Sequence, residues 1–106
     1  MAEILTSIKQ AVLARRLEFS DKAAMEMEAD GLTELDVAES IVNAVAVYKT
    51  IRSRSPRRSA PREYLHVIVG QNFHGLPVYT KGKLVCRAGD DAFYYLVSSK
   101  RSIFGD

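Results

Sequence analysis

The chain is poor in the residues that cross-link a small protein or interrupt its backbone. Its 106 residues include one cysteine, three prolines and no tryptophan. Cys86 has no second thiol for an internal disulfide or a structural zinc site, which fits a reducing compartment. We expect it to be a buried or half-buried strand residue, since unpaired cysteines behave as small hydrophobes. With no internal repeat and no dividing linker, residues 1–106 are expected to form a single domain.

Long apolar runs and several catalytic motifs are also absent. No run approaches the roughly 20 residues of a membrane span, and the N-terminus lacks the basic region and apolar stretch of a signal peptide. We therefore expect a cytoplasmic protein with no membrane partner. The sequence contains no glycine-rich phosphate loop, no His-x-x-x-His or Cys-x-x-Cys pair and no Gly-x-Ser-x-Gly elbow. These absences argue against a nucleotide cofactor, a zinc or other metal site and a serine hydrolase.

Charge is distributed unevenly along the chain, although the net charge is only +2. Residues 1–46 carry four basic and nine acidic side chains, whereas residues 47–106 carry eleven basic and four acidic ones. Such asymmetry indicates an anionic partner for the basic half, and nucleic acid is the commonest partner of this kind. The alternative is a charged surface that serves solubility alone.

Apolar residues at helical spacing predict three helices in the acidic half. The first is expected over about 3–15. The second should follow a Ser20 cap and end at Gly31, and the third should begin after Thr33, with Asp36 completing a capping-box-like arrangement. The side chains expected in the core from these last two helices are Met25, Met27, Leu35, Ala38, Ile41, Val42 and Val45.

Alternating and β-branched residues predict strands in the basic half, at about 46–52, 64–69, 76–86 and 92–97. Turns are expected at His74-Gly75 and at 88–91, and residues 17–19 are expected to be a short connection. The predicted fold is α+β: three N-terminal helices pack on one face of a small, mainly antiparallel sheet of about four strands. The other face or an edge is left for a partner.

The stretch 53–62 combines four arginines, two prolines and three serines, a composition typical of a loop. It is either a flexible solvated connection or a phosphate-contacting arm, because guanidinium groups match phosphate oxygens. The residues that we expect to contact RNA are Arg52, Arg54, Arg57, Arg58, Lys81, Lys83 and Arg101.

The basic half also offers groups suited to metal-free RNA cleavage. That reaction needs one group to take the proton of the 2′-hydroxyl, one to protonate the leaving 5′-oxygen, and cations to stabilise the transition state. His66 can transfer protons near neutral pH, Tyr79 can do so if a lysine lowers its pKa, and lysines such as Lys49 and Lys100 can supply charge. Equally, a single strand histidine is an ordinary hydrogen-bonded surface residue.

Several motifs resemble a bacterial domain-of-unknown-function family of small cytosolic proteins. They are Phe19-Ser20-Asp21 before the second helix, Gly31-Leu32-Thr33 before the third, and Leu76-Pro77-Val78-Tyr79-Thr80-Lys81-Gly82-Lys83 in the hairpin. That family is grouped with toxins of type II toxin–antitoxin pairs, near the BrnT, RelE and motility quorum-sensing regulator (MqsR) ribonucleases. The resemblance runs from about residue 4 to residue 101.

The resemblance implies a toxin that cleaves mRNA, either free or on the ribosome, and a cognate antitoxin with a zinc-finger domain encoded by the adjacent gene. The MqsR active site is a Lys, a Gln, a Tyr and a Lys on the sheet. Lys49, Tyr79 and Lys100 match three of these, and His66 stands where the family has glutamine. The expected catalytic set is therefore Lys49, His66, Tyr79 and Lys100.

Two other functions are consistent with the same residues. A non-catalytic module of this fold would bind RNA or a protein partner through the same face without cleaving it. A structural or interaction subunit would bind no nucleic acid at all.

Overall fold

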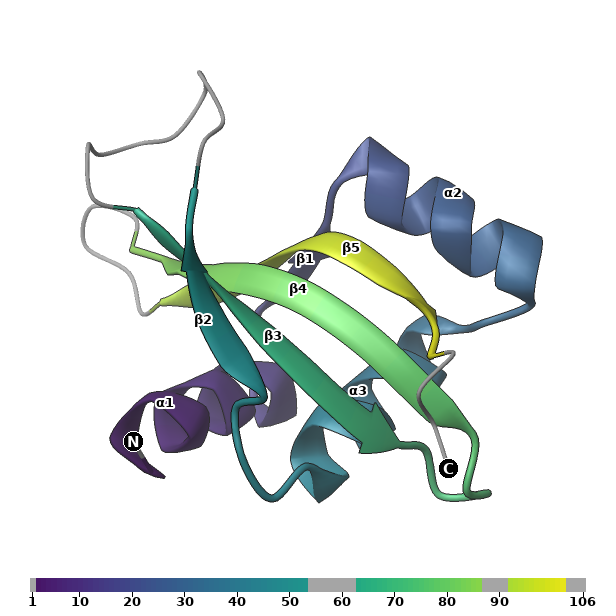
Figure 1. Ribbon diagram of the computed structural model, residues 1–106, viewed down its shortest axis with the longest axis horizontal. Coiled ribbons are helices and arrows are strands. Elements are labelled where there is room, and N and C mark those ends of the chain that lie inside the picture. Colours follow the sequence, from purple (N-terminus) through teal and green to yellow (C-terminus); the bar gives the residue numbers. More distant parts are fainter. Residues whose placement is uncertain (1, 54–62, 87–91, 103–106) are drawn as a thin grey trace.

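The computed structural model describes residues 2–53, 63–86 and 92–102 and places helices on a mixed sheet in that part of the chain. The helices are α1 (Ala2–Leu13), α2 (Asp21–Asp30) and α3 (Glu34–Asn43). The strands are β1 (Leu17–Phe19), β2 (Lys49–Arg52), β3 (Tyr64–Gln71), β4 (Pro77–Val85) and β5 (Phe93–Arg101). Their order in the sheet is β1-β5-β4-β3-β2. Helices α1 and α3 lie behind the sheet in Figure 1.

The α+β class predicted from the sequence is confirmed, but the described residues form a sheet of five strands rather than about four. The additional strand is β1, which the sequence predicts as a connection. It pairs in parallel with β5, whereas the other neighbouring strands are antiparallel. Three residues are too few for alternation to distinguish a strand from a loop, so β1 owes its conformation to pairing with β5.

The predicted caps of α2 and α3 are confirmed. The Ser20 hydroxyl accepts a hydrogen bond from the Ala23 N–H at 3.0 Å, and Gly31 ends α2 in the left-handed region with φ 71°. At the start of α3, Thr33 Oγ1 accepts from the Asp36 N–H at 3.1 Å, and Asp36 Oδ2 accepts from the Thr33 N–H at 2.9 Å. These reciprocal bonds satisfy N–H groups that have no partner within the helix.

The core lies between the helices and one face of the sheet. It contains buried residues of all three helices together with Ile68, Val78, Tyr94 and Leu96 of the sheet. Three predicted core residues are exposed instead: Met25 at 69%, Leu35 at 65% and Val45 at 96%. The buried residues of α3 are Val37, Ser40 and Ile41.

A close approach of α3 to β3 explains which face of α3 is turned toward the sheet. A Cβ atom at Gly70 of β3 would overlap the backbone carbonyl of Ser40. A small residue on each side thus lets the helix backbone rest directly on the strand, so the contact is made by Ser40 rather than by a large apolar residue. The spacing of apolar residues alone does not reveal such a contact.

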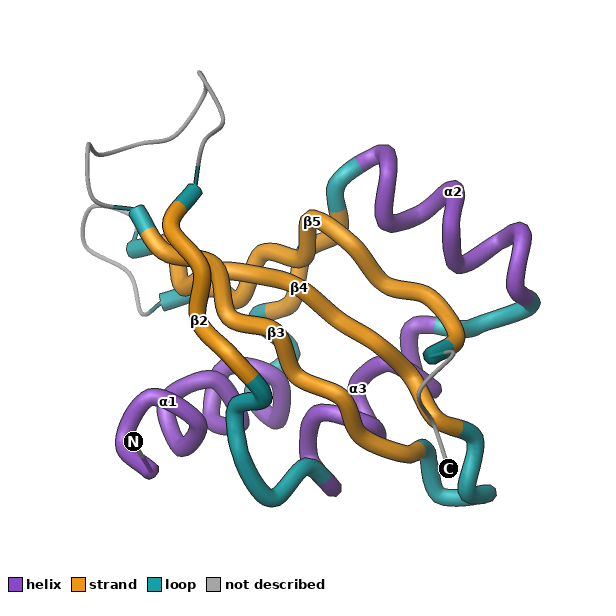
Figure 2. Tube along the Cα trace, viewed as in Figure 1, coloured by secondary structure: helices purple, strands orange, loops and turns teal. Residues whose placement is uncertain are grey.

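Helix α2 runs beside β5, as Figure 2 shows, and covers the part of its edge that β1 leaves open. The Ser99 N–H donates to Glu26 Oε1 at 3.1 Å, and the Arg101 N–H donates to Asp30 Oδ2 at 2.8 Å. The Ser20 hydroxyl donates to the Val97 carbonyl at 3.3 Å. Side chains of α2 therefore take the backbone groups that an open sheet edge would offer to another chain.

The remaining sequence predictions have mixed outcomes. Gly75 has φ 84°, which confirms the predicted turn between β3 and β4. Cys86 is exposed, so its predicted burial is wrong; it follows the last residue of β4. The predicted turn at 88–91 and most of the arginine-rich loop lie outside the described residues. Among the described helices, none combines the length and apolar character that crossing a membrane requires.

Candidate functional site

Cross-strand pairing sorts the strand residues onto two faces, because directly opposed residues share a face and successive residues alternate. Ile68 and Val78 belong to the core beneath the helices. Their neighbours Val67 and Tyr79 therefore point to the opposite face. Val67 lies opposite both Lys49 and Lys81, and Tyr79 lies opposite Lys100.

We call this surface, which is turned toward the viewer in Figure 1, the lysine face. The residues that define it are Lys49, Val67, Tyr79, Lys81 and Lys100. Lys49 and Lys100 are exposed and Lys81 is half-buried, whereas Val67 is fully buried. The lysine face thus has an apolar floor and a cationic surface.

Lys81 occupies the middle of the lysine face. It lies between Val67 of β3 and Ser98 of β5, and Val67 in turn separates it from Lys49. Burial lowers the pKa of Lys81, and the positive charges of Lys22, Lys100 and Lys49 lower it further, against an opposing effect of Glu26. Partial burial among other cations makes Lys81 release its proton more readily than an ordinary lysine.

Tyr79 and Lys100 form a cross-strand pair beside Lys81. The Lys100 Nζ atom lies 5.4 Å from the centre of the Tyr79 ring, a distance at which a cation is attracted by the face of the ring. Burial raises the pKa of Tyr79, and the negative charge of Glu26 raises it further. Tyr79 therefore keeps its proton at neutral pH and can donate it. A role as proton acceptor would instead require a lowered pKa.

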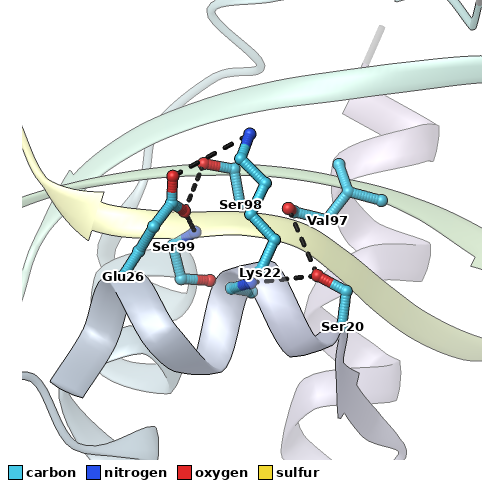
Figure 3. Close-up of polar contacts among 7 residues, drawn as sticks. Ser20, Lys22, Glu26, Val97, Ser98 and Ser99 are labelled. Carbon is cyan, nitrogen blue, oxygen red and sulfur yellow. Dashed lines mark hydrogen bonds and ion pairs between the residues drawn. The ribbon is translucent and has the colours of Figure 1, made fainter.

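Helix α2 adds a lysine and a glutamate at the margin of this face. Figure 3 shows Lys22 and Glu26 rising from α2 beside β5. Glu26 Oε1 accepts from the Ser98 hydroxyl at 2.7 Å, and Glu26 Oε2 lies 3.9 Å from Lys22 Nζ. The carboxylate is thus held against β5 while its charge acts on the pKa values of Lys81 and Tyr79.

His66 does not lie on the lysine face. It is opposite Thr50 and Gly82, and it alternates with Val67, so its side chain is on the helix side of the sheet. Its Nδ1 atom is 3.1 Å from the Thr50 hydroxyl, and burial lowers its pKa. Lys49, Tyr79 and Lys100 therefore lie on one face of the sheet and His66 lies on the other. That these side chains surround one phosphate stays a prediction.

The residues predicted to contact RNA also lie on both faces of the sheet. Lys83 lies on the same face of the sheet as Lys81. Its Nζ atom is 3.0 Å from Glu63 Oε2 and 5.7 Å from the centre of the Tyr95 ring, so its charge is already paired. Arg52 is opposite Tyr64, and Arg101 is opposite Val78, so both belong to the helix side. Arg54, Arg57 and Arg58 lie outside the described residues.

Sequence reasoning missed Lys22 and Glu26 as members of the site. Their i,i+4 spacing on an acidic helix is typical of an exposed ion pair. Only the packing of α2 beside β5 places them near Lys81, and no sequence signal indicates that packing. Within the described ranges, no three His, Cys, Asp or Glu side chains form a group that could hold a metal ion.

Comparison with known proteins adds no relative to this geometry. The sequence matches no protein-family model, and neither a curated protein nor a solved structure matches it. The resemblance to the toxin ribonucleases therefore stays a prediction.

Proposed function

We propose that this protein is a toxin-like endoribonuclease that binds single-stranded mRNA on the lysine face and cleaves it without a metal. The observation that carries the proposal is the placement of Lys49, Lys81 and Lys100 with Tyr79 on a sheet face that the described helices leave open. Such a surface offers three ammonium groups to the phosphates of one RNA segment.

Binding to this face should depend strongly on salt. Each phosphate that a lysine neutralises releases counterions, and on single strands the logarithm of the affinity falls by about 0.7 per contact for each tenfold rise in salt. Three contacts from Lys49, Lys81 and Lys100 give a slope of about −2. Replacing one of these lysines should reduce that slope by close to one contact.

We assign the proton transfers to Lys81 and Tyr79. In its neutral form, the Lys81 amine takes the proton of the 2′-hydroxyl, and the 2′-oxygen attacks the neighbouring phosphorus. The bond from phosphorus to the 5′-oxygen breaks, and the Tyr79 hydroxyl gives its proton to that oxygen, since an alkoxide is far more basic than a phenolate. The products are a 2′,3′-cyclic phosphate and a 5′-hydroxyl end, and proton exchange with water restores both residues.

Lys49 and Lys100 stabilise the negative charge that builds up on the phosphate oxygens during this reaction. Both are exposed, so an RNA segment can reach them without any movement of the fold. Cations at these positions stabilise the transition state more than the ground state, because the negative charge on the phosphate oxygens is larger there.

The test is cleavage of end-labelled RNA by the purified protein in the presence of EDTA. The expected products carry 5′-hydroxyl and cyclic-phosphate ends, and a variant with Lys49, Lys81 and Lys100 all replaced by alanine should be inactive. Arg15→Gln serves as the matched control, since Arg15 is exposed and lies two residues before β1, at the other edge of the sheet. Equal cleavage by the triple variant would refute the assignment.

A second candidate is favoured by one observation, the location of His66 on the helix side of the sheet. In that case the lysine face holds RNA but does not cleave it. This function predicts RNA retention with the same salt dependence and the same loss in the triple variant, but no new 5′-hydroxyl ends at any pH.

The toxin proposal includes a partner protein. An antitoxin that neutralises the chain should cover the lysine face with acidic side chains. The resemblance implies that this antitoxin carries a zinc-finger domain and is encoded by the adjacent gene. Co-expression with the product of the adjacent gene should restore growth and block RNA binding in the same stoichiometric complex. A neighbouring product that leaves RNA binding intact would contradict this.

A further inference from the structure

Two exposed tyrosines lie at the β2 end of the sheet. Of the five tyrosines in the chain, Tyr48 is 66% exposed and Tyr64 is 47% exposed, whereas Tyr94 is fully buried and Tyr79 and Tyr95 are half-buried. An exposed tyrosine presents part of a large apolar ring to water, and such rings are enriched where proteins bind partners.

Each of these rings has a basic neighbour. Tyr48 directly precedes Lys49, and its N–H donates to the Val67 carbonyl at 2.8 Å, which fixes it at the start of β2. Tyr64 lies directly opposite Arg52 at the other end of the β2–β3 pair, and Arg52 is exposed. A flat ring beside a cation is the combination that holds a base and its phosphate in single-stranded RNA.

The β2 edge separates the tyrosines from the lysine face, because Tyr64 shares the face of Arg52 and Tyr48 alternates with Lys49. Among the described strands, β2 is the outermost on its side of the sheet, and it is only four residues long. Lys49 points to the lysine face and Arg52 points to the helix side, so basic side chains flank this edge on both sides. An RNA strand that leaves the lysine face over β2 would meet Lys49 before the edge and Arg52 after it, with Tyr48 and Tyr64 on the far side of the edge.

We propose that Tyr48, Arg52 and Tyr64 form a second RNA contact, the β2 edge site, which binds the nucleotides flanking the phosphate held on the lysine face. The bases stack on the two rings, and Arg52 contacts a phosphate between them. This inference rests on the proposed function, because it extends the same RNA strand beyond the lysines.

Charge favours RNA over a protein as the occupant. The edge offers Lys49 and Arg52 near its aromatic rings, and no aspartate or glutamate occurs among residues 44–53. Glu63, which precedes Tyr64, is paired with Lys83. A flanking nucleotide needs both a cation and a stacking surface, whereas a purely apolar protein contact would gain nothing from the cations.

The experiment measures the affinity of the full chain for 2′-O-methylated oligouridines of about four and about twelve nucleotides, lengths that span the usual site sizes of single-strand binders. Methylation blocks attack by the 2′-oxygen, so binding is measured without cleavage. A Tyr48→Leu, Tyr64→Leu double variant is expected to bind the long oligomer at least about tenfold more weakly and the short one unchanged.

Two controls separate stacking from folding. Tyr48→Phe with Tyr64→Phe keeps the rings and should restore the affinity for the long oligomer. Phe73→Leu removes a ring that is 65% exposed at the opposite end of β3 and should change neither affinity. Arg52→Gln should lower the salt slope of the long oligomer by close to one contact and leave that of the short oligomer unchanged.

The outcomes distinguish this inference from the proposed function. If the parent binds neither oligomer, the lysine face and the β2 edge site both fail. If the parent binds both and the leucine variant keeps full affinity for the long one, only the β2 edge site fails, and a protein becomes the better occupant of the tyrosines. Equal weakening of both lengths would also overturn it, because the rings would then act through the lysine face.

Discussion

Lys81 differs from the other lysines of its face because of its surroundings. Lys49 and Lys100 are exposed, whereas Lys81 is half-buried above Val67 and close enough to other lysines for their charge to affect its pKa. Burial and like charge both favour the neutral amine, so the two effects act in the same direction. A lysine in this position can exchange a proton where an exposed lysine supplies only charge.

The pH dependence of cleavage should report this property. The rate should rise with pH as Lys81 loses its proton, and because its pKa is lowered, the rise should begin below the range of an ordinary lysine. It should fall only when Tyr79 loses its proton, at a pH above the ordinary range because the pKa of Tyr79 is raised.

Lys81→Arg provides the corresponding variant. Arginine keeps the charge but cannot release its proton in this range, so single-turnover cleavage should fall by about 10²-fold or more and lose its ascending limb. Lys49→Arg is the matched variant, and its cleavage rate should still rise with pH as that of the parent does. An unchanged profile in Lys81→Arg would contradict the role of Lys81.

Substitution of His66, unlike that of Lys81, should leave cleavage unchanged. The His66 side chain is on the helix side of the sheet, so His66→Gln should cleave RNA at the parental rate, since glutamine can keep the hydrogen bond with Thr50. Loss of single-turnover cleavage in a variant with parental thermal stability would mean that the lysine face is not the reaction site.

The resemblance to the toxin pattern predicts that Lys49, His66, Tyr79 and Lys100 lie together, whereas the structure places His66 on the other face of the sheet. The sequence could not reveal this, because the face of a strand residue depends on the register between strands. A shift of one residue in that register exchanges the two faces, and the sequence does not specify it.

At the level of the elements, caps were more predictable than packing. Ser20, Gly31 and the Thr33–Asp36 pair act within a few residues, so local sequence is sufficient to predict them. The orientation of α3 depends on Ser40 meeting Gly70, and β1 depends on β5, both far apart in the chain. Long-range contacts of this kind determine which residues are buried, so the predicted burial of Leu35 is wrong. The predicted burial of Val45 is wrong because α3 ends at Asn43, before this residue.

The contact between α3 and β3 can be tested with Gly70→Ala. The added methyl group would overlap the Ser40 carbonyl, so α3 has to move away from the sheet. The expected loss is about 1–3 kcal/mol or more of the free energy of unfolding. Urea denaturation measures it, and a variant as stable as the parent would show that α3 does not rest on β3 in this way.

Asp36 links the start of α3 to the β3–β4 turn. Its carboxylate accepts from the Thr33 N–H at 2.9 Å and from Asn72 Nδ2 at 3.1 Å, and Asn72 Oδ1 in turn accepts from the N–H groups of His74 and Leu76. The backbone hydrogen bond from Thr33, followed by the bond from Asn72, lowers the pKa of Asp36. The turn is therefore tied to the helix layer through a charged group.

This arrangement predicts a pH-dependent contribution to stability. Because the folded-state pKa of Asp36 is lowered, its contribution is fully present above the unfolded-state pKa and is lost as pH falls through the folded-state value. Asp36→Ala should cost about 1 kcal/mol at neutral pH, a typical loss for a helix cap, and the difference from the parent should shrink in acid. Urea titrations at several pH values test this, and a constant difference down to strongly acidic pH would contradict it.

At the level of the whole molecule, the uneven charge of the sequence becomes a difference between layers. The acidic first half forms the helices, and the basic second half supplies Lys49, Lys81 and Lys100 of the sheet. The sequence predicted an α+β fold with one free sheet face, because three helical stripes need only one face to bury. It did not predict the contribution of α2, whose Lys22 and Glu26 come from the acidic half and act on Lys81.

An NMR titration of the labelled protein with a short 2′-O-methylated RNA tests binding to the lysine face most directly. RNA bound there should shift the amide signals of Lys49, Val67, Lys81 and Lys100 together with one affinity and leave those of α1 and α3 in place. Shifts concentrated on α1 and α3, or no shifts at low salt, would contradict it.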